Sequence, residues 1–244
     1  MAQIFIVGGQ RCGSTFLLRQ FSNIPNVFST FGLAPEPKYF LPENFVSRDH
    51  YYETVFGHRS DEMEFSVEKS TTYYEREDAL RLIQKEIPES QVLFVMRDPI
   101  QRACSNYWFS VSNNLEKRGI DEALFTEKTI RPSGMSTSPF SYVQRSRYKQ
   151  YLDTMNSIFR DSQIHYLIFE EIVSSQRKIL DLLESLGISS GNLELNSTPE
   201  NVSNNKTNSI SEYTIELLAE ELREDYIAVA EQIGYWPTGW RKIG

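Results

Sequence analysis

One loop organises this chain: Gly8-Gly9-Gln10-Arg11-Cys12-Gly13-Ser14-Thr15. An apolar run, Ile4–Val7, precedes it, and apolar residues at helical spacing follow it as far as about Ile24. The pattern predicts a strand, a glycine-rich loop and a helix. Such a loop turns its backbone N–H groups inward, and the first turn of the helix adds the positive end of its dipole. We therefore expect an anion site suited to phosphate, with a chance glycine-rich turn as the alternative.

The loop differs at one position from the phosphate-binding loop of nucleoside-triphosphate enzymes. Gly8 and Gly13 have the separation of the G-x-x-x-x-G-K-[ST] pattern, but Ser14 stands where that pattern has a lysine. Enzymes that act on nucleoside triphosphates need this lysine on the β- and γ-phosphates, together with a magnesium site. The nearest cation is Arg11, inside the loop. The sequence therefore disfavours a nucleotide kinase or other P-loop phosphotransferase, which is the alternative enzyme.

A second motif follows the apolar run Val92–Met96, which has the length of a strand. Arg97 ends this run, Asp98 is a favourable helix N-cap, and Pro99 suits the first helical position. Ser105 lies about two turns into that helix. An arginine at the carboxyl end of a parallel strand lies where open α/β sheets bind ligands, and its guanidinium suits a phosphomonoester. Two such sites on neighbouring strands indicate one nucleoside ligand with phosphates at both ends.

Both motifs resemble those of the sulfotransferases that use 3′-phosphoadenosine 5′-phosphosulfate (PAPS). The family's 5′-phosphosulfate loop, K/R-x-G-[ST]-[ST], is matched from Arg11 to Thr15. Its 3′-phosphate motif, R-D-P-x-x-R-x-x-S-x-Y, is matched by Arg97, Asp98, Pro99, Arg102, Ser105 and Tyr107. The resemblance runs from Ile4 to the region of Trp240 and is weak beyond about Phe169. It implies PAPS as the cofactor, bound by Gln10, Arg11, Cys12, Gly13, Ser14, Thr15, Arg97 and Ser105.

Two further residues match the heparan sulfate or carbohydrate-type members, which the chain resembles most in its motifs. Glu36, between two prolines in Ala34–Phe40, matches the proposed catalytic base of that subgroup. Lys69 matches the lysine of its V-E-K-[ST] passage, which lies near the sulfuryl group. The alternatives are a solvated loop glutamate and an ordinary lysine at the end of a strand. The resemblance thus implies Glu36, Lys69 and Arg11 as catalytic residues, with Arg11 on the leaving oxygen.

The remaining basic and histidine candidates match less well. In the family a basic loop late in the chain closes over the cofactor, and Lys206 is the candidate here, with a solvated lysine as the alternative. Many cytosolic sulfotransferases use a histidine base near the strand that ends at Lys69, and this chain has none there. His50, His58 and His165 fit no ligand spacing, so we expect no metal site.

Strand and helix patterns alternate along the 244 residues, which predicts a P-loop-like α/β fold with a parallel sheet between two layers of helices. We expect a single sulfotransferase domain over residues 1–244. Residues 113–140 have weak periodicity, and 131–139 among them are rich in turn formers, which predicts a long loop, a candidate lid. Later patterns predict a helix over 141–159, a strand over 164–169 and helices over 170–186 and 211–233.

Composition bounds the partners and the location. The formal net charge is −8, which disfavours nucleic acid and polyanionic acceptors, because these favour a basic surface. The first residues lead directly into the first strand and no run is long enough to span a membrane, so we expect no signal peptide, no membrane contact and a cytoplasmic protein. Cys12 and Cys104 are too few for a disulfide framework and are expected to be reduced fillers.

The function predicted from these residues is in-line transfer of a sulfuryl group from PAPS to an acceptor hydroxyl or amine, with a carboxylate as general base. The acceptor is left open among small molecules, sugars and carrier-bound chains. A non-enzymatic alternative is a nucleotide-binding module that has kept the cofactor site and lost catalysis. That alternative is favoured only if neither Glu36 nor Lys69 faces the site.

Overall fold

The computed structural model describes residues 2–57, 63–126, 130, 135–189 and 210–243. The chain forms two compact units. One comprises Met1–Val95 with Thr154–Glu200, and the other comprises Met96–Asp153 with Asn201–Gly244. Each unit is described by itself.

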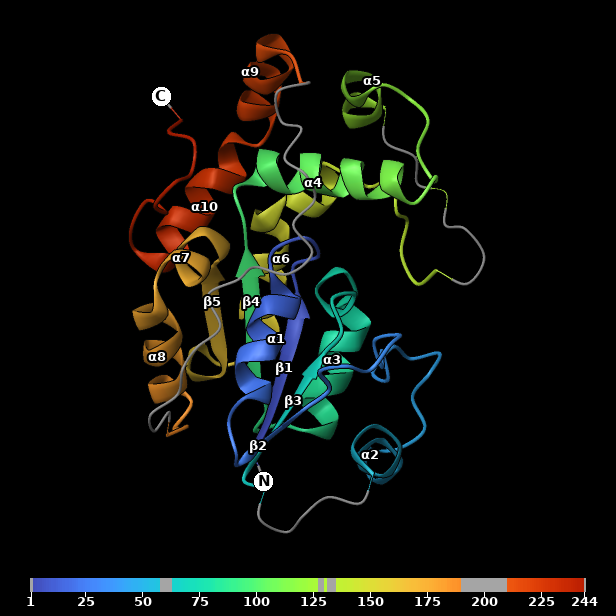
Figure 1. Cartoon of the computed structure of the whole chain (residues 1–244), viewed down its shortest axis with the longest axis vertical. Helices are drawn as coiled ribbons and strands as arrows, with labels where there is room; N and C mark the ends of the chain where they lie inside the picture. The colour runs from blue at the N-terminus through green and yellow to red at the C-terminus, as the bar shows by residue number, and fades with distance from the viewer. Residues whose placement is uncertain (1, 58–62, 127–129, 131–134, 190–209, 244) are drawn as a thin grey trace. The chain divides into compact units, whose positions relative to one another are not determined.

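The first unit contains a five-stranded sheet with the order β2-β3-β1-β4-β5 (Figure 1). Its strands are β1 (Ala2–Gly8), β2 (Val27–Ser29), β3 (Phe65–Lys69), β4 (Gln91–Met96) and β5 (Ile164–Ile168). In the register of this parallel sheet, Ile6 of β1 lies opposite Lys69 on one side and Leu93 on the other. The ends of β3 and β4 therefore lie at the same edge as the glycine loop, and the predicted α/β fold with a parallel sheet is confirmed.

The central strand β1 is buried on both faces, which explains its unbroken apolar sequence. Ile4 and Ile6 belong to a core cluster with Leu17 of α1 (Ser14–Ser22) and Leu183 of α8 (Gln176–Ser185). Figure 1 shows α1 crossing in front of β1. On the opposite face, Phe5 packs against aromatic rings of the segment that follows β2 and of the turn after β3, namely Phe40, Tyr51 and Tyr73.

The other helical elements of the first unit are short. They are α2 (Arg48–Tyr51), a π-helical turn (Tyr52–Phe56), α3 (Glu77–Glu86), α7 (Phe169–Ser174) and 3₁₀ turns at Tyr73–Glu75 and Asp161–Gln163. The single helix predicted over 170–186 is two helices, because Ser175 between α7 and α8 has extended backbone angles. The helix after the glycine loop was predicted to end near Ile24, which precedes Pro25, but it ends at Ser22.

The second unit is helical and is built around α4 (Pro99–Ser112), which contacts α5 (Ile120–Phe125) and α9 (Glu212–Glu221) (Figure 1). It also contains a 3₁₀ turn (Gln144–Ser146) and α10 (Arg223–Ile233), while α6 (Tyr148–Ile158) begins in this unit and ends in the first. As predicted, α4 begins with Pro99, and the Asp98 side chain caps it by accepting a bond from the Gln101 N–H, 3.0 Å away.

Two predictions for the second unit were wrong in detail. The stretch 113–140 is not one continuous loop, because α5 forms within it and buries Ile120, Ala123 and Leu124, which have helical spacing. The helix predicted over 211–233 is divided at Leu222, whose side chain is fully buried and whose backbone leaves the helical conformation.

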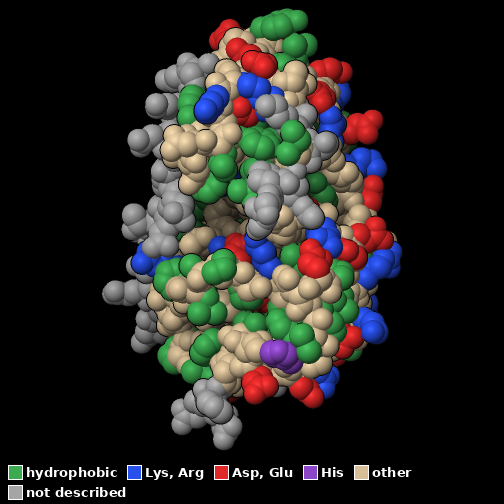
Figure 2. All heavy atoms as spheres, turned by 90° about the vertical axis from the view of Figure 1, so that its right-hand side faces the viewer, with side chains coloured by type: hydrophobic (Ala, Val, Ile, Leu, Met, Phe, Trp, Pro, Cys, Tyr) green, Lys and Arg blue, Asp and Glu red, His purple; other side chains and the backbone are tan. Residues whose placement is uncertain are grey.

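The surface carries charges of both signs. In the view of Figure 2, Lys and Arg side chains are interspersed with Asp and Glu side chains. Helices able to cross a membrane, by length and apolar character, do not occur in the described part of the chain.

Candidate active site

The glycine loop joins β1 to α1 at the carboxyl edge of the sheet. The Gly9 N–H donates to the Val95 carbonyl at 2.7 Å, which ties the loop to β4, and the Cys12 N–H donates to the Gly9 carbonyl at 3.2 Å. Gly13 precedes α1 with φ +77°, and none of the described side chains caps the helix there. The N-terminus of such a helix suits an anion, because its first N–H groups point out of the helix and carry the positive end of its dipole.

Close packing requires glycine at two positions of this loop. A Cβ atom on Gly8 would lie 2.4 Å from Cδ1 of Tyr74, and one on Gly13 would lie 2.4 Å from Cδ2 of Phe169. The positive φ of Gly13 adds a second reason, because residues with side chains rarely adopt it. Among the other predicted loop residues, Cys12 and Ser14 are buried, whereas Gln10, Arg11 and Thr15 are partly exposed.

Lys69 links the loop to Glu36. Its Nζ donates to Thr15 Oγ1 at 3.1 Å and lies 2.9 Å from Glu36 Oε1. This contact follows from the topology, because β3 pairs with β1 and ends at the same edge as the loop. Lys69 thus contacts residues that lie more than 30 positions away from it in the sequence.

The Glu36 carboxylate is held from a second side. It accepts hydrogen bonds from the Thr71 N–H at 2.9 Å and from Thr71 Oγ1 at 3.1 Å. The side chains of Glu36 and Lys69 are 20% and 15% exposed, so the ion pair is partly buried yet open to an incoming molecule. We call these four residues, Thr15, Glu36, Lys69 and Thr71, the Glu36 site.

A fully buried acid lies next to Lys69 in the sequence. Glu68 of β3 accepts hydrogen bonds from the hydroxyls of Ser70, Tyr73 and Tyr51, and burial raises the pKa of its carboxyl to about 7. Sequence reasoning missed this residue. The strand pattern of Phe65–Lys69 could have indicated it. Successive side chains of a strand point to opposite faces, so Glu68 points away from the face of Lys69 and into the interior.

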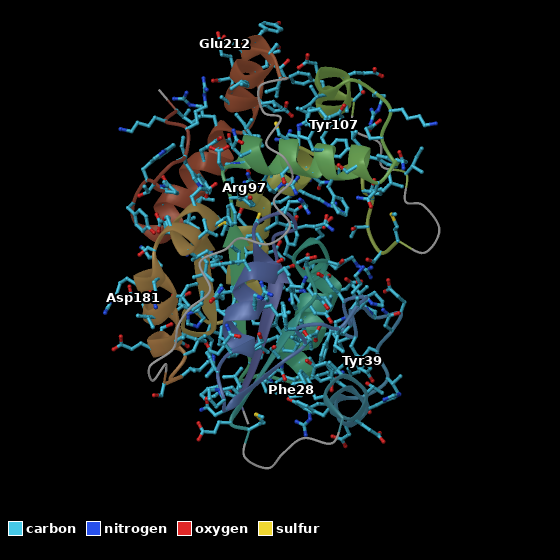
Figure 3. All side chains as sticks on the ribbon, in the orientation of Figure 1. Phe28, Tyr39, Arg97, Tyr107, Asp181 and Glu212 are labelled. Carbon is cyan, nitrogen blue, oxygen red and sulfur yellow. The ribbon has the colours of Figure 1, made fainter. Side chains whose placement is uncertain are left out.

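The second motif lies in the other unit and its backbone is held by a tyrosine. Arg97 directly follows β4 (Figure 3), and the hydroxyl of Tyr148 accepts its N–H at 3.1 Å and donates to its carbonyl at 2.9 Å. Oδ2 of Asp98 accepts bonds from the Tyr226 hydroxyl at 2.9 Å and from the Arg241 N–H at 3.1 Å. We call Arg97, Asp98 and Ser105 the Arg97 site. Sequence reasoning did not assign Tyr148 and Tyr226 to it.

Two residues of the matched motif have structural contacts. Arg102 is fully buried, and its Nε donates to Ser146 Oγ at 2.7 Å while Nη2 donates to the Tyr142 carbonyl. The Tyr107 hydroxyl donates to the Arg118 carbonyl at 2.7 Å. Arg102 and Tyr107 therefore hold parts of the second unit together.

The remaining candidates are Lys206, the histidines and the two cysteines. Lys206 and His58 lie outside the described residues. His165 contacts Gln91 at 2.8 Å, and burial lowers the pKa of its imidazole. Cys12 and Cys104 are free and buried, and burial raises the pKa of the Cys104 thiol to about 12. Groups of three or more His, Cys, Asp and Glu able to hold a metal ion do not occur within the ranges that the structure describes.

Known proteins resemble this chain over most of its length. Residues 1–227 match the family described as the sulfotransferase domain. The bifunctional heparan sulfate N-deacetylase/N-sulfotransferase 1 of Caenorhabditis briggsae is 26% identical over 194 residues, covering 75% of this chain and 22% of that protein. The heparan sulfate glucosamine 3-O-sulfotransferase 3A1 of Mus musculus is 23% identical over 187 residues, covering 75% of this chain and 46% of that protein.

The chain therefore spans less than half the length of these curated relatives. Among solved structures, a sulfotransferase from Alicyclobacillus acidocaldarius aligns over 99% of both chains with a TM-score of 0.79 and 20% identity. This likeness supports the fold.

Proposed function

Because the chain belongs to the sulfotransferase domain family, we propose that it transfers the sulfuryl group of PAPS to an acceptor hydroxyl or amine. The observation that carries this proposal is the position of Lys69, whose Nζ contacts both Thr15 of the glycine loop and the Glu36 carboxylate. The ammonium group of Lys69 thereby joins the loop proposed to bind the donor to the carboxylate proposed to accept the proton. Such an arrangement suits transfer between a bound anion and a hydroxyl.

On the donor side, PAPS supplies the activated sulfuryl group, and residues of the glycine loop bind its 5′ end. We assign this role to Gln10, Arg11, Cys12, Gly13, Ser14 and Thr15. Their N–H groups, together with the Arg11 guanidinium and the hydroxyls of Ser14 and Thr15, stabilise the charge that develops on the leaving oxygen. The uncapped N-terminus of α1 supports this assignment.

The 3′-phosphate is assigned to Arg97 and Ser105, on the strength of the matched motif. The Tyr148 hydroxyl, bonded to both backbone polar groups of Arg97, supports it by holding the point where the side chain leaves the main chain. Lys206 remains a further candidate for the cofactor, by resemblance alone.

On the acceptor side, Glu36 takes the proton. Lys69 orients this carboxylate through their ion pair, and the partial exposure of Glu36 leaves it open to an acceptor. Lys69 also steadies the group in transfer, because Nζ reaches the hydroxyl of Thr15 in the loop.

We propose a small-molecule, sugar or carrier-bound acceptor in a cytoplasmic setting, with residues 1–244 working as a single domain. The net charge of −8 speaks against a polyanionic acceptor. A P-loop kinase is not favoured, because Ser14 replaces the lysine that phosphoryl transfer requires. An inactive nucleotide-binding module is also disfavoured, since Glu36 and Lys69 both lie at the loop.

An acceptor screen with ³⁵S-labelled PAPS tests the proposal. Label should move to one acceptor class with release of 3′-phosphoadenosine 5′-phosphate (PAP), and the transfer should persist in EDTA. Transfer that stops with EDTA and returns with magnesium would favour a phosphotransferase instead.

A further inference from the structure

The buried carboxylate of Glu68 stands at the centre of a small hydroxyl network in the first unit. Ser70 Oγ donates to Oε1 at 2.5 Å and the Tyr73 hydroxyl donates to the same atom at 3.0 Å. The Tyr51 hydroxyl donates to Oε2 at 2.9 Å. Glu68 itself is 0% exposed, so it does not touch a substrate.

Two of these hydroxyls also bind the segment that carries Glu36. Ser70 Oγ accepts the Lys38 N–H at 2.8 Å, and the Tyr73 hydroxyl accepts the Phe40 N–H at 3.0 Å. Tyr39, which is labelled in Figure 3, lies between Lys38 and Phe40 in the sequence. Its ring packs edge-on against those of Phe40 and Phe45. The main chain two and four residues beyond Glu36 is therefore fastened through two hydroxyl groups.

The directions of these hydrogen bonds follow from a count of protons. A hydroxyl group has one proton. When its oxygen accepts a hydrogen bond from a backbone N–H, its own proton is directed to a different acceptor. For Ser70 and Tyr73 the acceptor is Glu68 Oε1. A carboxylate can receive all three hydroxyl protons, whereas an aliphatic side chain would leave the donors unsatisfied in the core.

We propose that Glu68 is a positioning residue, which orients the hydroxyls of Ser70 and Tyr73 so that they hold the 36–40 segment and aim Glu36 at Lys69. The inference rests on the proposed role of Glu36 as general base. It explains why an acid occupies a fully buried place in β3, where an ionised group is costly unless hydrogen bonds compensate.

The groups that face Glu68 are consistent with this role. The Tyr51 and Tyr73 hydroxyls come from α2 and the turn after β3, and burial holds the pKa of both phenols well above the usual range, so they remain donors. The charge of Glu36 acts against ionisation of Glu68, whereas the hydrogen bonds from Ser70, Tyr51 and Tyr73 favour its ionised form.

Tyr73 and Tyr51 provide a matched pair of variants. Each phenol is fully buried and donates to Glu68. In the part of the chain that the structure describes, the Tyr73 hydroxyl also accepts a hydrogen bond from the Phe40 N–H, and the Tyr51 hydroxyl accepts none from the 36–40 segment. Tyr73→Phe should therefore loosen the segment, and Tyr51→Phe should leave it as it is. Ser70→Ala should act on Lys38, and Glu68→Leu on both amides. Glu68→Gln should rescue, because its carbonyl oxygen can still accept from both hydroxyls.

The experiment measures amide hydrogen exchange of Lys38 and Phe40 by NMR in the protein without ligands. Tyr73→Phe should speed exchange of Phe40 about three- to tenfold, the range that corresponds to one hydrogen bond, with Tyr51→Phe unchanged. Glu68→Leu should speed both amides, and Glu68→Gln should stay near wild type. Equal exchange of Phe40 in the two tyrosine variants would overturn the proposal.

Turnover of labelled PAPS with the acceptor found by screening tests the positioning role of Glu68 separately from the proposed role of Glu36. Tyr73→Phe should lower kcat with little change in KM for PAPS, whereas Tyr51→Phe should keep both. If Glu36→Gln is inactive but Tyr73→Phe turns over like Tyr51→Phe, the positioning role fails and the proposed function stands. If Glu36→Gln is fully active, the proposed function of Glu36 fails by itself.

Discussion

The Glu36 site and the Arg97 site are held by different kinds of contact. In the Glu36 site, hydrogen bonds and an ion pair act on the charged atoms themselves, since Lys69 and Thr71 both contact the carboxylate of Glu36. In the Arg97 site, Tyr148 acts on the main chain of Arg97 by binding its N–H and carbonyl, and the carboxylate that hydrogen bonds hold is that of Asp98, the cap of α4.

This difference teaches what each site requires. Proton transfer depends on the position of one oxygen within a fraction of an ångström, and a carboxylate that is itself held suits the base role proposed for Glu36. A phosphate is a large anion with several acceptor oxygens, and a guanidinium on a firmly held backbone can reach it. We therefore expect substitutions in the Glu36 site to change turnover, and substitutions in the Arg97 site to change cofactor affinity.

The largest effect is expected from Glu36→Gln, which keeps the shape of the side chain and removes the proposed base. Turnover with PAPS and the screened acceptor should fall about 10²- to 10⁴-fold, the usual contribution of a general base. Affinity for PAP should change little. Glu53→Gln, an exposed acid of the π-helical turn, is the control and should behave as wild type. Near-normal turnover of Glu36→Gln would contradict the claim that the Glu36 site controls turnover while the Arg97 site controls cofactor affinity.

Lys69→Met should have the next largest effect on turnover. The variant loses the charge that contacts Glu36 and Thr15, and charge-assisted hydrogen bonds contribute about 1.5–3 kcal/mol. A decrease of roughly ten- to a hundredfold in kcat is expected. Lys85→Met, an exposed lysine of α3, is the control. Steady-state kinetics that show a change in KM alone would contradict the role in transfer.

Arg97→Ala should weaken PAP binding without a comparable loss for AMP, which lacks the 3′-phosphate. The loss for PAP should be about 1.5–3 kcal/mol, measured by calorimetry. Arg81→Ala, on the exposed side of α3, should leave both affinities unchanged. Parallel weakening of PAP and AMP would show that Arg97 does not read the 3′-phosphate.

The last prediction concerns folding stability and its dependence on pH. Because burial raises the pKa of Glu68 to about 7, the folded protein keeps a proton that the unfolded chain releases near pH 4.5. This contribution to stability is fully present below that value and is lost as the pH rises through about 7, at about 1.4 kcal/mol for each unit by which the pKa is raised. Urea unfolding between pH 4.5 and 8 should show this decline in wild type and a flatter profile in Glu68→Gln. Superimposable profiles would contradict a buried, titrating Glu68.

Local patterns predicted the parts of the fold that local physics controls. The apolar run before Gly8 and the Asp98-Pro99 start of α4 specify their elements through burial and capping within a few residues. The breaks at Ser175 and Leu222 lie inside stretches where apolar residues keep their helical spacing, so periodicity alone did not predict them.

The same distinction applies to the candidate site. Glu36 and Lys69 stood in recognisable passages, so their resemblance to a known family pointed to them. The bonds of Tyr73 to Phe40 and of Ser70 to Lys38 join residues 33 and 32 positions apart, and no short motif records them. They depend on the path of the chain over the face of the sheet.

The central claim is that this chain binds a nucleoside with phosphates at both ends, and calorimetry tests it without knowledge of the acceptor. Wild-type protein in EDTA is titrated with PAP, AMP and ATP. PAP should bind about ten- to 150-fold more tightly than AMP, the ratio that corresponds to one charge-assisted 3′-phosphate contact of about 1.5–3 kcal/mol. Equal affinities for PAP and AMP, or tighter binding of ATP that requires magnesium, would contradict the account.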